Sequence, residues 1–289
     1  GLRDLWLSES YHPRQEGADD DDDQATDLIT FTSAATALFM SLDDAEFTIA
    51  SLTADTANDA TITISDDGNT GRITIVGNVS QADGAGDLII KGSDDASTLD
   101  LEGNVANATG VGAGVIKFQL DNTDTLEMAG ATKTNAASID GVAAGEGILK
   151  IVGDTNTFSG LIGAVKRIKL INVDDKAVFS AAVVTATIDS DEIAIFNGTL
   201  NASGVTNFDG AASEINGDAT LTGVMTVEDI TLKIGADLTL GATAVLGHAN
   251  AILAVQNGSA TSTITGAIDG GNAAGGEGKI DITNTATAT

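Results

Sequence analysis

LIIKGSDDASTLDLEG, from Leu88 to Gly103, is followed by two stretches of the same design: VIKFQLDNTDTLEMAG from Val115 and ILKIVGDTNTFSGLIG from Ile148. Each begins with alternating apolar residues, continues through a turn of Asp, Asn, Ser and Thr, and closes on Gly after a second short apolar run. A unit built from strands that recurs about every thirty residues predicts a solenoid, in which each repeat forms one coil stacked on the last. The expected fold class is therefore all-β: a parallel β-solenoid, or β-helix.

The first two stretches align without a gap. This alignment places Ile89 over Ile116, Asp94 over Asp121, Thr98 over Thr125, Leu99 over Leu126 and Gly103 over Gly130. Further strand candidates recur through the rest of the chain. With about 25 residues in a coil and strands about 4.8 Å apart, they predict about ten coils and a rod on the order of 50 Å long.

The composition is consistent with a narrow, stacked core. Aromatic residues make up only 3% of the 289 residues, so the interior must be built from Ala, Val, Ile, Leu and Thr. Branched side chains pack well on a pleated surface. There are 34 Gly and one Pro, so tight corners are expected at Gly, Asn and Asp, and backbone donors stay available for long ladders.

An antiparallel sandwich is the competing fold, at least for the final third. Asn-Gly pairs favour hairpin turns, and three of them occur at Asn197-Gly198, Asn216-Gly217 and Asn257-Gly258. The spaced repeats argue against a sandwich for the middle third, because a solenoid tolerates inserted loops at its corners.

The N-terminal residues differ from the rest, and the sequence divides into an arm with an acidic linker (1–24) and a β-solenoid region (25–289). The arm contains the only Trp and the only Tyr, and its apolar residues are Leu5, Trp6, Leu7 and Tyr11. It either docks on a neighbouring subunit or folds back over the first coil of its own solenoid. Asp19 to Asp23 form an unbroken acidic run, which predicts a solvated linker.

The net charge of −29 limits the partners. Nucleic acid and anionic lipid surfaces are repelled, whereas cations, basic proteins and polysaccharide are not. No apolar run reaches the roughly 18 residues of a membrane span, and GLRDLWLSES lacks the apolar centre of a signal peptide. The absence of Cys excludes disulfides and thiolate chemistry.

Catalysis finds little support, and no catalytic residue is assigned. Only His12 and His248 titrate near neutrality, and no hydrolase elbow, zinc-protease motif or P-loop is present. Acidic pairs occur at many turns, so they are better explained as solvated corners than as one active site. We therefore expect a protein that is not an enzyme.

Calcium is the metal that the turns predict, because Asp and Asn supply hard oxygen ligands. Two clusters stand out: Asp121, Asn122 and Asp124, and Asp154 with Asn156. The calcium β-roll signature fails, since GGEGKID from Gly275 has Ile280 where Asp is required.

The TLDLEG run, the GNV closures and the G-x-G-[VI]-[IL]-K pattern of residues 60–170 resemble passenger regions of bacterial autotransporter-type surface proteins and similar secreted cell-surface β-solenoids. The resemblance implies secretion to the cell surface or beyond, and a role in adhesion or surface coating. It supplies no catalytic residue.

These observations predict a non-catalytic extracellular structural protein. The tail ITNTATAT has no charge to block an open strand edge, so head-to-tail self-assembly through the arm and the terminal strands into a filament or an S-layer-like lattice is expected. The alternative is a monomeric adhesin or fibre that binds glycan or a host surface. A third hypothesis is a polysaccharide-active β-helix.

Overall fold

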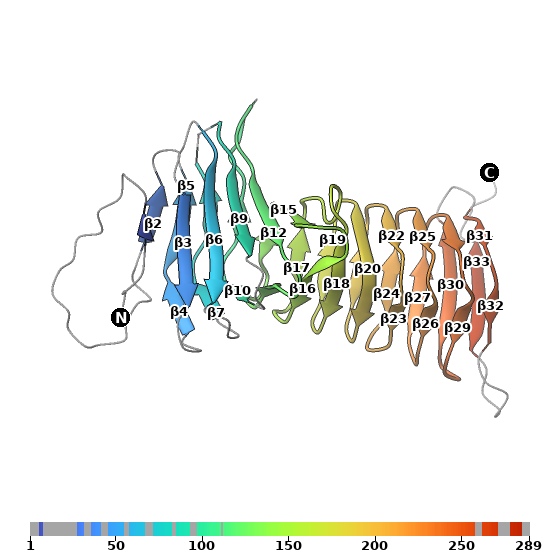
Figure 1. Cartoon of the computed structure of the whole chain (residues 1–289). Helices are drawn as coiled ribbons and strands as arrows, with labels where there is room; N and C mark the ends of the chain where they lie inside the picture. The colour runs from blue at the N-terminus through green and yellow to red at the C-terminus, as the bar shows by residue number, and fades with distance from the viewer. Residues whose placement is uncertain are drawn as a thin grey trace.

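The computed structural model is an elongated rod of strands that runs from the N-terminal coils to the C-terminal coils (Figure 1). The structure describes residues 6–7, 28–31, 36–41, 46–54, 58–66, 72–82, 85–92, 97–110, 112–257, 262–270 and 278–284. Within these ranges every regular element is a strand. No helix in them has the length and hydropathy needed to cross a bilayer.

Three faces of parallel strands enclose the core. The first face carries one strand from each coil, except that Ile162 bridges Ile139 to Val183 where a strand is missing. Its strands are β3 (Thr36–Ser41), β6 (Ala60–Asp66), β9 (Leu88–Gly92), β12 (Ile116–Leu120), β15 (Ser138–Gly141), the first half of β20 (Val183–Ser190), β22 (Leu200–Ala202), β25 (Ala219–Leu221), β28 (Leu238–Leu240) and β31 (Ile264–Thr265).

The second face lies next along the chain in each coil. It consists of β4 (Glu46–Ile49), β7 (Arg72–Ile75), β10 (Thr98–Leu101), β13 (Thr125–Met128), β16 (Glu146–Ile151), β18 (Ile168–Val173), the second half of β20, β23 (Thr206–Phe208), β26 (Met225–Val227), β29 (Ala244–Leu246) and β32 (Ile268–Asp269).

The third face is a continuous sheet of twelve strands, one from each successive coil, compared with the roughly ten coils expected. They are β2 (Leu28–Phe31), β5 (Ser51–Ala54), β8 (Val79–Gln81), β11 (Val105–Ala106), β14 (Thr134–Asn135), β17 (Asn156–Phe158), β19 (Ala177–Phe179), β21 (Ala194–Phe196), β24 (Ser213–Ile215), β27 (Thr231–Ile234), β30 (Ile252–Asn257) and β33 (Lys279–Asn284). The predicted parallel β-solenoid is confirmed.

One described strand breaks the parallel pattern. The arm forms β1 (Trp6–Leu7), which pairs antiparallel with β3 and places Trp6 beside Leu38. The backbone of these two arm residues thus lies against the first coil of its own chain, as in the fold-back alternative. Leu5 and Tyr11 lie outside the described residues.

The coils shorten along the rod, as the narrowing in Figure 1 shows. Asn78 and Asn104 occupy the same corner 26 residues apart, and Ser97 and Asp124 are 27 apart. From β18 to β20 the repeat is 17 residues. It is 19 in the pair Asn197 and Asn216, and it lengthens again to 26 in the pair Leu238 and Ile264. The final third therefore continues the solenoid, and the sandwich alternative is wrong there: Asn197-Gly198 and Asn216-Gly217 are corners, while Gly258 lies outside the described residues.

The ungapped alignment of the first two repeats is right for one strand and wrong for another. Thr98 lies beside Thr125 and Leu99 beside Leu126, as predicted. On the first face, however, Ile116 pairs with Leu88 and not with Ile89. Leu88 and Ile116 both point inward, and a one-residue slip would have turned the apolar set outward. One more residue separates Leu88 from Thr98 than separates Ile116 from Thr125.

The third sequence repeat, from Ile148, also belongs to the solenoid, but its first strand lies on the second face and not on the first. Its opening strand β16 stacks on β13, with Ile148 beside Thr125, and not on β12. In the coil that starts at β15, the strand SIDG fills the first face instead.

The core is a continuous apolar column formed by the inward residues of all three faces. At its middle, the rings of Phe158, Phe179 and Phe196 stack on successive coils, with centroids 5.1 and 4.8 Å apart. These spacings are close to the separation of neighbouring strands. Stacking like on like is therefore what fills the interior of a chain that has few aromatic residues.

Candidate functional site: polar corners and a charged face

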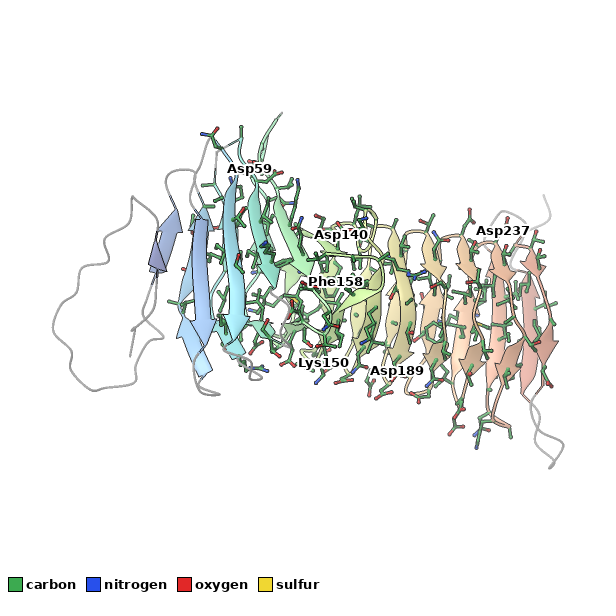
Figure 2. The ribbon with its side chains drawn as sticks, in the orientation of Figure 1. Asp59, Asp140, Lys150, Phe158, Asp189 and Asp237 are labelled. Atoms are coloured by element: carbon green, nitrogen blue, oxygen red, sulfur yellow. The ribbon has the colours of Figure 1, made fainter. Side chains whose placement is uncertain are left out.

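Polar side chains at the corners join each coil to the next. At the corner that leads into the first face, Asp59 Oδ1 accepts a hydrogen bond from the Asp87 amide at 2.9 Å, and Asp87 Oδ1 accepts one from Val115 at 3.0 Å. The same arrangement recurs near the C-terminal end of the rod, where Asp237 Oδ1 accepts from the Thr263 amide at 2.8 Å. Asp59, Asp140 and Asp237 lie along one long edge of the rod (Figure 2).

The corner into the third face uses Asn in the same way. Asn78 Oδ1 accepts from the Asn104 amide at 3.0 Å, and Asn104 Oδ1 accepts from Thr134 at 2.9 Å. Asn156 is fully buried: its Oδ1 accepts from Lys133 of the preceding coil and its Nδ2 donates to Gly153. Backbone amides that strands cannot pair at a corner are thereby satisfied.

Asp124 forms the most buried of the carboxylate corner contacts, with 2% of its surface exposed. Its Oδ1 accepts from the amide and the hydroxyl of Ser97, at 3.1 and 2.9 Å, and its Oδ2 accepts from the Asp121 amide at 3.0 Å. Burial raises the pKa of Asp124 to about 6 against the opposing effect of these hydrogen bonds. A small cavity of about 10 Å³ beside it, room for one water, is lined mainly by apolar side chains such as Ile90 and Phe118.

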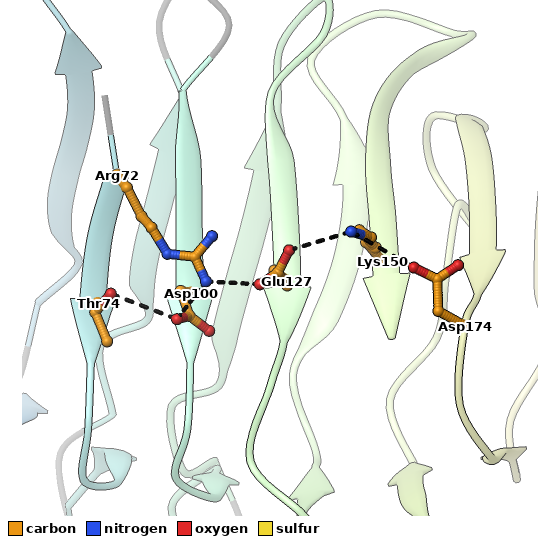
Figure 3. A network of polar contacts seen from close by, with 6 residues as sticks. All are labelled: Arg72, Thr74, Asp100, Glu127, Lys150 and Asp174. Carbon is orange, nitrogen blue, oxygen red and sulfur yellow. Dashed lines mark hydrogen bonds and ion pairs between the residues drawn. The ribbon is translucent and has the colours of Figure 1, made fainter. Parts of the chain in front are cut away.

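A line of charged side chains crosses the outer side of the second face (Figure 3). Arg72 Nη2 lies 2.6 Å from Asp100 Oδ2 and 2.6 Å from Glu127 Oε1, so one guanidinium joins three coils. Lys150 continues the line, 3.7 Å from Glu127 and 3.5 Å from Asp174.

Within this line Asp100 is 3% exposed, and its Oδ1 has no hydrogen-bond partner among the described residues. Burial raises the pKa of Asp100, although the hydrogen bond from Arg72 acts in the opposite direction. Burial lowers the pKa of Arg72, but the hydrogen bonds to Glu127 and Asp100 outweigh it and leave the pKa raised. The cluster is thus held by opposite charges that compensate one another.

Further along, carboxylates gather at the corner that follows the second face. Desolvation, and then the charges of Asp209 and Asp189, raise the pKa of Asp191. Like charges one coil apart repel each other and disfavour full ionisation. Among the described residues, no group of three or more His, Asp or Glu side chains is arranged to hold a metal ion.

The five predicted calcium ligands fall at two separate corners. Asp121, Asn122 and Asp124 lie between β12 and β13, whereas Asp154 lies between β16 and β17 and Asn156 is the first residue of β17. Asp124 and Asn156 use their side chains as coil-to-coil contacts, Asp121 Oδ1 accepts from the Asn122 amide, and Asp154 Oδ1 accepts from the Thr155 hydroxyl. Calcium binding stays a prediction.

The charged line was missed by sequence reasoning, although a signal for it exists. Arg72 opens β7, while Asp100, Glu127 and Lys150 each take the third place of TLDL, TLEM and ILKI in β10, β13 and the end of β16. Charges of both signs that recur at the coil period on an outward position indicate a salt-bridged ladder.

His248 lies at a corner, where its Nδ1 is 3.1 Å from Asp229 Oδ1. Both side chains are more than half exposed, and neither lines the cavity beside Asp124. His12 lies outside the described residues.

Comparison with known proteins adds no relative: no family model, no curated protein and no solved structure matches this chain.

Proposed function

We propose that this chain is an extracellular structural protein without catalytic activity, which assembles with copies of itself into a filament or lattice at a cell surface. The observation that carries the proposal is the use of the corner carboxylates and amides. Side-chain oxygens at these corners accept hydrogen bonds from backbone amides of the neighbouring coil, as seen at Asp59, Asp87, Asp124 and Asp237. Groups of this kind hold a rod together and are not left to act on a substrate.

The open edges of the sheets support assembly. Among the described strands, β33 ends the third face with one edge unpaired, and its Ile282 is 75% exposed. Strand edges with apolar neighbours are surfaces on which another strand is readily added. The net charge of −29 keeps such a protein soluble until specific contacts form.

Sedimentation velocity of the full chain over a hundredfold range of concentration tests this function. We expect the mean sedimentation coefficient to rise with concentration and elongated oligomers to appear. A single monomeric species at every concentration, at both low and physiological salt, would contradict the proposal. Binding of glycan by such a monomer would favour the adhesin alternative.

A further inference from the structure

A basic and apolar surface interrupts the acidic rod where the coils shorten. This surface, the junction patch, consists of Val142, Leu161, Val165, Lys166, Arg167 and Lys169. Its three apolar side chains are 44%, 47% and 79% exposed, respectively. Lys166 and Lys169 are exposed as well. Val165, the most exposed of the large apolar residues in the described chain, would be expected inside and not in water.

Backbone contacts bring the two segments of the patch together. The Gly141 amide donates to Lys166 O at 3.0 Å, and the Gly145 amide donates to Arg167 O at 2.7 Å. Asp140 Oδ1 accepts from the amides of Val165 and Lys166, at 2.9 and 3.1 Å. The loop after β15 and the loop before β18 therefore form one surface that is fixed by hydrogen bonds.

The cations of the patch lack acidic partners. Among the described residues, no carboxylate lies within ion-pair distance of Lys166, Arg167 or Lys169, although the chain has 42 acidic residues. Arg167 Nη1 donates to Ser203 at 2.7 Å, but its buried Nε has no acceptor in the same part of the chain. The carboxylates beside the patch are already engaged: Asp140 as above, and Glu146, whose Oε2 accepts from the Ala143 amide.

We propose that the junction patch binds the acidic run Asp19–Asp23 of a second copy of this chain. This run places five carboxylates in sequence, and opposite charges steer and orient such contacts. The exposed apolar residues of the patch supply area to bury beside the charges. The inference rests on the proposed self-assembly, and it identifies one contact of that assembly as lateral.

The chain between Asp23 and β2 is too short for Asp23 to reach the patch of its own chain. Asp23 lies five positions before Leu28, the first residue of β2, and five residues span at most about 18 Å. The patch lies beside β15 and β18, and five strand spacings separate β2 from β17 of the same coil as β15, or about 24 Å. A neighbouring rod lying alongside, shifted along the axis, meets no such limit.

A labelled peptide of residues 8–27 tests the contact directly. Fluorescence anisotropy is measured as the peptide is titrated with the full chain at low salt. We expect saturable binding that weakens at least tenfold in K166E/K169E, and no binding by a peptide with Asn at positions 19–23. The matched control is K133E/K176E, which carries the same charge change on two other lysines without a carboxylate partner among the described residues. Equal weakening in both variants would overturn the proposal.

Sedimentation separates this inference from the proposed function. If the native chain associates and K166E/K169E associates equally well, the docking contact is wrong although assembly stands. If the native chain stays monomeric, assembly is wrong, and the peptide titration alone decides the contact. If the peptide binds only to a chain whose own run has been changed to Asn, while the native chain sediments as a monomer at the same concentration, no second copy fills the patch and the proposal is overturned.

Discussion

The coils before β17 and those after β20 build the same three-faced cross-section from different lengths of chain. In the early coils, repeats of 26 to 28 residues carry strands such as β6 and β12 and corners with several polar residues. In the coils from β22 to β28, repeats of 19 residues carry mostly strands of three residues, and the last coils lengthen again. The inward positions stay stacked in both regions. Register therefore fixes the fold, and the corners absorb the differences in length.

The stacked rings of Phe158, Phe179 and Phe196, the Phe column, lie where the two regions meet. Removing one of these rings should lower the unfolding free energy more than any other change considered below. Phe179→Ala removes the central ring between Phe158 and Phe196 and leaves a cavity, so we expect a loss of about 3–5 kcal/mol of unfolding free energy. In a solenoid, the contacts between neighbouring coils make the coils unfold together. Weakening these contacts at the boundary should let the two regions unfold separately, so that urea unfolding shows two transitions. Val178→Ala, on the outward side of the same strand, should keep a single transition. One cooperative transition in Phe179→Ala would contradict the idea that this column couples the regions.

Asp124 lies in the long-coil region, and its titration should make the stability of that region depend on pH. Its folded pKa of about 6 lies above the ordinary 3.8. The stabilisation is therefore complete below pH 3.8 and is lost as the pH rises through 6, by about 3 kcal/mol. Asp124→Asn should flatten the resulting fall of melting temperature between pH 4 and 7, as followed by circular dichroism. The exposed corner variant Asp154→Asn serves as the control. A pH profile for Asp124→Asn that matches the native profile would show that Asp124 does not titrate as described.

Glycines stack at one corner of the long coils, at Gly77, Gly103 and Gly130, and they also stack in the short coils, where a Cβ added to Gly217 would lie 2.2 Å from the Gly198 carbonyl oxygen. A Cβ added to Gly103 would lie 1.9 Å from the Gly77 carbonyl oxygen. Gly103→Ala should therefore cost about 2 kcal/mol, because backbone must move. At Gly235, in the short coils, the nearest atom is the Asn216 side-chain oxygen at 3.1 Å, so Gly235→Ala should cost much less. Equal losses in chemical denaturation would contradict the idea that the neighbouring backbone decides the cost of a Cβ at these corners.

The charged line should matter less than the core, because Arg72 is 36% exposed. Arg72→Met keeps the apolar stem but leaves Asp100 buried without its cation, while Glu127 keeps only Lys150, so we expect a loss of about 1–2 kcal/mol. Lys117→Met breaks a more exposed pair with Asp87 and should cost under about 1 kcal/mol. Urea denaturation should therefore show a larger loss of unfolding free energy for Arg72→Met than for Lys117→Met, and the reverse order would contradict this account.

Addition of calcium should change the stability of the protein less than any of the substitutions above. The side-chain oxygens of Asp124 and Asn156 already accept hydrogen bonds from backbone amides, so a calcium ion would have to displace them. We expect calcium and a chelator to change the melting temperature by less than about 2 °C. A larger rise with calcium would restore these corners as metal sites.

The long coils were predictable from sequence, and the short ones were not. TLDL and TLEM share a pattern and a spacing, so their register followed from alignment. A three-residue strand such as Leu200–Ala202 offers only two inward residues, and the 19-residue repeat in LNASG and ATLTG is hidden by Asn, Thr and Ala. The slip of one residue between Ile89 and Ile116 arose because a corner changed length where the apolar pattern did not. The junction patch could not be predicted from the sequence, because backbone hydrogen bonds bring together two loops that are separated along the chain.

Electron microscopy of the native full chain, imaged beside K166E/K169E, tests the central claim most directly. The account predicts rods that associate side by side and end to end in the native protein, whereas the variant should associate only end to end. Isolated single rods of native protein at high concentration would contradict it.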